Sequence, residues 1–192
     1  MKIGVGLATL AAVIVALALA ALHLPARSGA SAARGWGACA GDRWFVRTLQ
    51  DRPKLLPARL TTVAKLNKLV RPSRVPATRH PSERQIVTLK TGALLRARAT
   101  NGDLVLWLLP LGNGNPKVKY VLATAPAPAC NSRATGYRRK QMGAARSKMP
   151  WAPCGTAQVT GVIFFSKGPR TPGETLNRVQ LSPVLGFEPQ CG

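Results

Sequence analysis

The chain has 192 residues, of which 28 are Lys or Arg and only six are Asp or Glu, so its formal net charge is +22. This length fits one ordinary domain and leaves little room for two. Apolar residues make up 46% of the chain, a globular proportion that excludes a disordered basic tail. Such a charge attracts polyanions, so the candidate partners are nucleic acid, anionic lipid headgroups and anionic polymers of the cell envelope. The alternative explanation of the charge is compositional: a GC-rich genome encodes Arg and Ala often.

The first 30 residues have the layout of a secretory signal peptide. Lys2 gives a short positive region, an apolar run follows over 3–24, and Pro25 ends it. Small residues within 28–32 then offer cleavage positions. The run is also about as long as the ~20 residues that cross a bilayer, so an uncleaved anchor with the domain outside is the alternative. The sequence therefore predicts a secreted or periplasmic protein.

A single domain is expected after a flexible segment. Residues 31–41 are small and flexible, and the domain occupies 42–192. Its first segment, 42–51, is rich in aromatic and β-branched side chains. Because such side chains favour a pleated surface, this segment predicts the first strand.

A proline-rich, basic connection follows the first predicted strand. Five prolines between residues 53 and 81 forbid a long helix. One short helix is expected after an N-cap at Thr61 or Thr62. Its apolar face would consist of Val63, Leu66, Leu69 and Val70.

A predicted hairpin comes next. Apolar and basic residues alternate in the second half of 85–100, and Asn101-Gly102 is a hairpin signal. The returning segment 104–111 is apolar on both faces, and 117–124 is interpreted as an extension of it.

One helix and two further strands complete the domain. The helix is expected over about 134–148, and the strands over 157–165 and 178–189. The apolar face of the helix is thin and consists of Tyr137, Met142 and Ala145. The order is five strands with one helix between the third and the fourth, as in an OB fold. We therefore predict a mainly β, five-stranded OB-like barrel.

Four cysteines remain in the domain after the predicted cleavage. They are Cys39, Cys130, Cys154 and Cys191. An even number in an exported protein favours two disulfides, and the spacings fit no zinc site. Three pairings are possible, of which we favour Cys130–Cys154 with Cys39–Cys191.

Several local patterns occur together along the chain. They are RWFVRTLQD, LTTVAKLNKL, RPSRVPATRHPSER, NGDLVLWL, APAC, VTGVIFF and LSPVL. Together they resemble a family of exported bacterial proteins of about this size whose function is unassigned. The resemblance covers residues 43–185 and implies an OB-type barrel, in agreement with the strand order.

The chain departs from this family's pattern where relatives usually carry titrating side chains. Val105 stands where a His is usual, two residues after the retained Asp103. Further such positions hold Ser166, Pro169, Gln180 and Ser182, and Thr171 stands where a Gln is usual. Residues that set the shape of the segment are retained at Gly173, Asn177, Leu181 and Pro183. The resemblance implies that relatives hold a site here and that this chain has lost its titrating groups.

The remaining titrating residues do not form a catalytic pattern. His80 is interpreted as a solvated loop residue, Asp103 as a turn residue, and Asp51 as the cap of the first strand. Acid–base and metal chemistry need several such groups together, so we expect no enzyme, no metal and no cofactor. A nuclease-like hydrolase is a distant third hypothesis that rests on fold analogy alone.

A basic surface that binds polyanions is the preferred functional prediction. An OB barrel presents its second and third strands and flanking loops to ligands, and Lys or Arg there would neutralise phosphates. The candidate residues are Arg96, Arg98, Lys117, Lys119, Arg138, Arg139, Lys140, Lys167, Arg170 and Arg178. A structural or interaction protein of the cell envelope, with the charge as a solubility device or surface anchor, is the alternative.

Overall fold

The computed structural model describes residue 39 and residues 41–98, 102–112, 119–149, 155–170 and 174–190, with the backbone alone over 93–98. The predicted signal peptide and almost all of the predicted flexible segment lie outside the described residues. No helix in the described part of the chain is both long enough and apolar enough to span a membrane.

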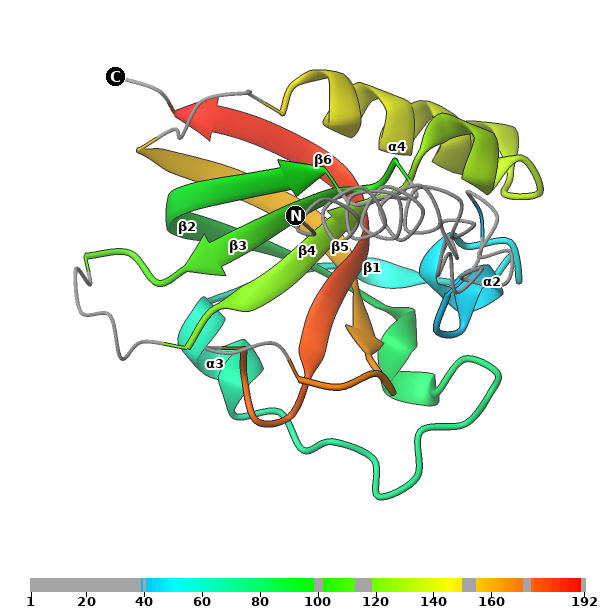
Figure 1. Cartoon of the computed structure of the whole chain (residues 1–192), viewed down its shortest axis with the longest axis horizontal. Helices are drawn as coiled ribbons and strands as arrows, with labels where there is room; N and C mark the ends of the chain where they lie inside the picture. Colours follow the sequence, from blue (N-terminus) through cyan, green and yellow to red (C-terminus); the bar gives the residue numbers. More distant parts are fainter. Residues whose placement is uncertain are drawn as a thin grey trace, which may run out of the picture. The chain divides into compact units, whose positions relative to one another are not determined.

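The described chain is mainly β, and six strands form one mixed sheet (Figure 1). They are β1 (Leu56–Thr61), β2 (Gln85–Arg98), β3 (Leu104–Leu109), β4 (Val121–Ala125), β5 (Thr156–Phe165) and β6 (Val179–Gln190). Strands β2 to β6 close a ring of hydrogen bonds in the order β2-β3-β4-β6-β5, because β2 also pairs with β5. β4 and β6 are parallel, whereas the other neighbours in the ring are antiparallel. β1 lies outside the ring, parallel to β2.

In the described residues, three α-helices and two 3₁₀ turns accompany the sheet. They are α2 (Trp44–Arg47), α3 (Val63–Asn67), α4 (Gly136–Ser147), η1 (Pro81–Arg84) and η2 (Pro128–Asn131). α4 stands between the third and fourth strands of the ring, which confirms the predicted order at this point. Met142 and Ala145 are buried as expected, but Tyr137 is 65% exposed.

The first predicted strand is wrong. The segment 42–51 contains the helix α2, which buries Trp44 and Val46, and not a strand. The edge that the first half of β2 leaves outside the ring is occupied by β1 and not by this segment. Tertiary contacts therefore override the β propensity of the aromatic and branched side chains.

Two other assignments need correction. β1 occupies part of the proline-rich connection where no strand was expected, and its residues pair with the first half of β2. The segment 117–124 is not an extension of the preceding strand: Leu104 pairs with Ala125, so β4 is a separate antiparallel strand. The five strands of the ring are consequently not the five that were predicted.

Alternation along the strands places the core inside the ring. In β3, Leu104, Leu106 and Leu108 are buried, and the residues that alternate with them are half-buried. Val63 and Leu66 add α3 to the same core. The prediction that Leu69 and Val70 belong to the apolar face of this helix is wrong. α3 ends at Asn67, and both residues are exposed.

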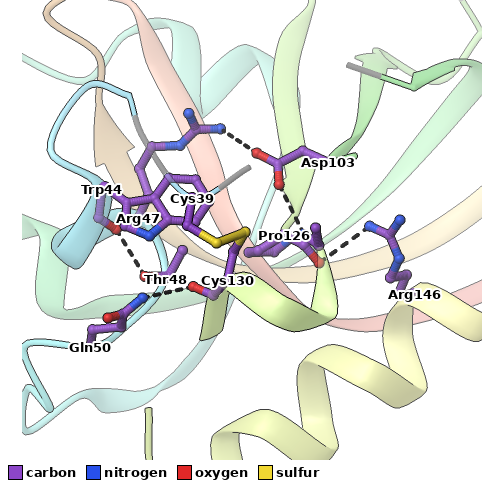
Figure 2. Close-up of a disulfide and its surroundings, with 10 residues drawn as sticks. Cys39, Trp44, Arg47, Thr48, Gln50, Asp103, Pro126, Cys130 and Arg146 are labelled. Carbon is purple, nitrogen blue, oxygen red and sulfur yellow. Dashed lines mark hydrogen bonds and ion pairs between the residues drawn. A yellow bond between two sulfur atoms is a disulfide. The ribbon is translucent and has the colours of Figure 1, made fainter. Parts of the chain in front are cut away.

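One disulfide joins Cys39 to Cys130, with Cα atoms 4.9 Å apart. This bond contradicts both favoured pairings, because each of them used one of these two cysteines. The segment next to Cys39 packs on η2: Trp44 of α2 contacts Ala127 and Cys130, and Gln50 Nε2, in the turn after α2, donates to Cys130 O at 2.7 Å (Figure 2). Cys154 and Cys191 lie outside the described residues.

Candidate polyanion-binding surface

A buried ion pair fixes the segment that carries α2. Both guanidinium Nη atoms of Arg43 donate to Glu83, whose side chain is completely enclosed. Phe165 N and His80 N also donate to this carboxylate, at 2.9 and 2.7 Å. Burial alone would raise the pKa of Glu83, but these hydrogen bonds and the positive charge of Arg43 hold it below its ordinary value. Glu83 is thus an ionised structural anchor. His80 caps η1 and is not a free loop residue.

A second polar cluster gathers around Arg47, on the side of β4 and β6 that faces α2 (Figure 2). Its guanidinium lies 3.7 Å from Asp103 and donates to Thr124 Oγ1 at 3.3 Å and to Ser182 Oγ at 3.5 Å. Asp103 is buried and accepts from Ala127 N at 2.9 Å, so it does more than end a turn. Burial lowers the pKa of Arg47, although Asp103 opposes that shift.

These contacts show where the positions named by the family resemblance lie. Asp103 and Ser182 come together, with Arg47 between them. Ser166 lies elsewhere and donates to Asp42 at 3.3 Å. Gln180 donates to Glu174 at 3.0 Å. Three further positions remain: Val105 is half-buried in β3, Pro169 is exposed, and Thr171 lies outside the described residues.

All six carboxylates of the chain have hydrogen-bond or ion-pair partners. Besides Glu83, Asp103 and Glu174, Asp51 pairs with Arg79 and Glu188 pairs with Lys148. The sixth, Asp42, accepts from Ser166 Oγ and from Lys167 N. Asp51 therefore does not cap a strand. Most Lys and Arg side chains in the described part of the chain are exposed to solvent.

Basic residues of α3 and of the β5–β6 connection lie on segments that are far apart in sequence and joined by hydrogen bonds. Asn177 Nδ2 donates to Leu66 O at 2.8 Å and to Leu69 O at 2.9 Å, which fastens the connection to α3. Asn67 Nδ2 donates to Lys119 O at 3.2 Å. We call the resulting group the α3–loop cluster. It consists of Lys65, Lys68, Arg71, Lys119, Lys167, Arg170 and Arg178.

Two arginines inside the α3–loop cluster are held near each other. Arg71 Nη1 donates to Asn177 O at 3.4 Å, next to Arg178 in the chain. Partial burial and then the charge of Arg178 lower the pKa of Arg71, while Asp42 and Glu174 act in the opposite direction. Arg178 is further tied to the carbonyls of Lys167 and Gly168, and its φ of 52° lies in the left-handed region. The fold therefore stabilises like charges in proximity, which favours an anionic ligand.

The predicted binding residues separate into groups. Lys119, Lys167, Arg170 and Arg178 belong to the α3–loop cluster. A second group, Arg138, Arg139 and Lys140, lies on α4, which Figure 1 draws along the upper edge while α3 is at the lower left. The others are not placed by side chain: Arg96 and Arg98 lie in β2 where only the backbone is described, and Lys117 lies outside the described residues.

The sequence prediction missed the part of the cluster that α3 contributes. Lys65, Lys68 and Arg71 belong to a short helix and its exit, far from the β5–β6 connection in the chain. The Thr62 N-cap predicted the helix correctly. No local pattern indicated that Asn177 would donate to the carbonyls of Leu66 and Leu69. These residues are more than 100 positions away in the chain, and only the folded structure brings them together.

Three comparisons with known proteins gave no match: no family model, no curated protein and no solved structure is similar to this chain.

Proposed function

We propose that this protein is a non-enzymatic binding module that recognises polyanions through the α3–loop cluster. The observation that carries the proposal is that hydrogen bonds join cation-bearing segments from three separate parts of the chain at α3, with Arg71 and Arg178 close enough to interact. Electrostatic contacts of this kind neutralise phosphate or carboxylate groups with little dependence on sequence. The engagement of all six carboxylates in structural contacts supports a binding role over acid–base catalysis.

We also propose that the ring of strands β2 to β6 is an OB-type barrel. The helix α4 follows the third strand of the ring, and the third and fifth strands are parallel neighbours. OB barrels bind ligands with the loop between their fourth and fifth strands, among other elements. Lys167, Arg170 and Arg178 lie in the corresponding β5–β6 connection. The family resemblance of the sequence points to the same barrel.

We propose, in addition, that the protein works outside the cytoplasm. Disulfides persist in oxidising compartments, so the bond between Cys39 and Cys130 agrees with export. The predicted signal peptide supports the same location. Anionic polymers of the envelope and extracellular nucleic acid are then the accessible partners.

Binding of oligo(dT) and of inorganic polyphosphate at increasing salt tests the proposal. We expect affinity for both and a linear fall of log affinity with log salt. The double variant K167Q/R170Q should bind about tenfold more weakly and show a smaller salt slope, because each phosphate contact contributes to that slope.

The variant R139Q/K140Q is the matched control, because it removes the same charge from exposed positions on α4. We expect its affinity to stay within about twofold of the wild type. Equal losses in the two variants would show that total charge, and not the α3–loop cluster, determines binding. Absence of measurable affinity at ~150 mM salt would contradict polyanion binding altogether.

A further inference from the structure

A second candidate site lies where β2 changes partners. Along one side of β2, the ladder with β1 ends at the pair Thr61–Leu89, and the ladder with β3 begins at Gly92–Leu109. β5 pairs with the opposite side over this stretch, so the interruption leaves an opening beside Lys90. A pocket of about 310 Å³ occupies this opening.

The pocket has an apolar wall that the fold leaves in contact with solvent. Its lining consists of Leu60, Thr61, Thr62, Thr88, Leu89, Lys90, Leu111 and Gln158. Leu60, in β1, is 86% exposed, and Leu111, in the turn after β3, is 49% exposed. Single exposed leucines are ordinary, but two from separate elements that face one hollow indicate a binding surface.

The charged side chain among the described lining residues is a cation, Lys90. Lys90 and Gln158 are paired across β2 and β5, so both side chains point to the outer face that the pocket shares. Lys90 is exposed, and no carboxylate occurs among the described lining residues. Threonines at 61, 62 and 88 add hydroxyl groups around the leucines.

We propose that this pocket binds a small amphipathic anion with a single aliphatic chain, such as a medium-chain fatty acid. Ligand pockets are mostly apolar with a few polar groups that fix orientation, and volumes of ~300 Å³ mark their lower end. The chain would cover Leu60 and Leu111, and the carboxylate would pair with Lys90. The size of the pocket favours one chain over a two-chain lipid. This site is independent of the α3–loop cluster and of polyanion binding.

Calorimetric titration with octanoate, octanol and octylamine tests the proposal, because the three probes share a chain and differ in headgroup charge. We expect octanoate to bind best, neutral octanol more weakly and octylammonium not at all. K90Q should weaken octanoate binding about tenfold, because it removes a charge-assisted contact. The double variant L60S/L111S should abolish it. Both leucines are exposed, so these substitutions leave the core intact.

Two control variants distinguish the pocket from the overall charge. R84Q removes an exposed cation at η1, outside the pocket, and should leave octanoate affinity unchanged. K167Q/R170Q should also leave it unchanged, whether or not that variant affects polyanion binding. Binding of octylammonium as strong as that of octanoate would overturn the proposal. An affinity for octanoate that is the same in K90Q as in the wild type, or reduced equally in R84Q, would do so as well.

Discussion

Glu83 is the residue on which the position of the N-terminal segment depends. It accepts hydrogen bonds from Arg43, from Phe165 N and from His80 N, and thereby joins α2, η1 and the end of β5. Arg43 in turn stacks on Phe164, with its guanidinium carbon 5.1 Å from the ring centroid. A buried charge with this many donors is costly to disturb from either side.

Glu83→Gln should destabilise the protein by about 3–5 kcal/mol, because Arg43 would keep a buried charge without a counterion. Urea unfolding followed by circular dichroism measures the change. Glu188→Gln is the matched control, since it breaks the exposed pair with Lys148 and should cost at most about 1 kcal/mol. Equal effects of the two substitutions would contradict the structural role of Glu83.

The lowered pKa of Glu83 also predicts a dependence of stability on pH. In the folded state this carboxylate loses its proton more readily than its ordinary value of 4.5 implies, so the unfolded state binds more protons between the two values. Stability from Glu83 is therefore complete above about pH 4.5 and is lost as pH falls through the lower folded pKa. Urea midpoints measured from pH 6 to pH 3 should fall less steeply for Glu83→Gln than for the wild type. Parallel curves would refute this linkage.

At the scale of the elements, β5 and β6 approach each other closely at Gly161. A Cβ atom added at Gly161 would lie 2.9 Å from Leu181 Cβ and 3.2 Å from Pro183 O. Neither neighbour can withdraw easily, because Leu181 is buried in the core and Pro183 O belongs to the backbone. The absence of a side chain at this position therefore permits the close approach of the two strands.

Gly161→Ala should destabilise the protein by about 1–3 kcal/mol through overpacking. Gly143→Ala is the counterpart, because a Cβ atom in the middle of α4 meets nothing within 4 Å. This second substitution should stabilise the protein by about 0.8–1 kcal/mol through helix propensity. Thermal unfolding of the two variants should thus shift in opposite directions, and shifts of the same sign would contradict the packing described for β5 and β6.

At the scale of the whole molecule, the charge of +22 acts against compactness. Four ion pairs, of which three are largely enclosed, use only a small part of the basic side chains in the described chain. The disulfide between Cys39 and Cys130 closes a long loop and limits the freedom of the unfolded chain. The fold is therefore stabilised by local attraction and a covalent link against a general repulsion.

Screening should make the protein more stable. We expect the thermal midpoint to rise when sodium chloride increases from 10 to 200 mM, since the Debye length falls from roughly 30 to below 10 Å. Differential scanning calorimetry at constant pH provides the measurement. A midpoint that falls over this range would show that the exposed cations are stabilised by attraction, and not strained by repulsion.

Local sequence pattern was sufficient to predict several elements. Alternation and turn residues identified the hairpin of β2 and β3, and the Thr62 N-cap identified the short helix α3. The apolar spacing of Met142 and Ala145 identified α4 between the correct strands of the ring. Composition determined the charge, and the even cysteine count indicated disulfide bonding, of which Cys39–Cys130 is an instance.

What each segment contacts depends on the tertiary structure. β1 occupies the edge of β2 outside the ring, the segment 42–51 contains α2, and the fold brings Cys130 to Cys39. It also fastened Asn177 to α3 and so assembled cations that are far apart in the chain. Local pattern fixes which face of a segment is apolar, because it depends on neighbouring residues alone. The pairing of a segment depends on which strand edges and surfaces the rest of the fold leaves available. The sequence of that segment alone does not contain this information.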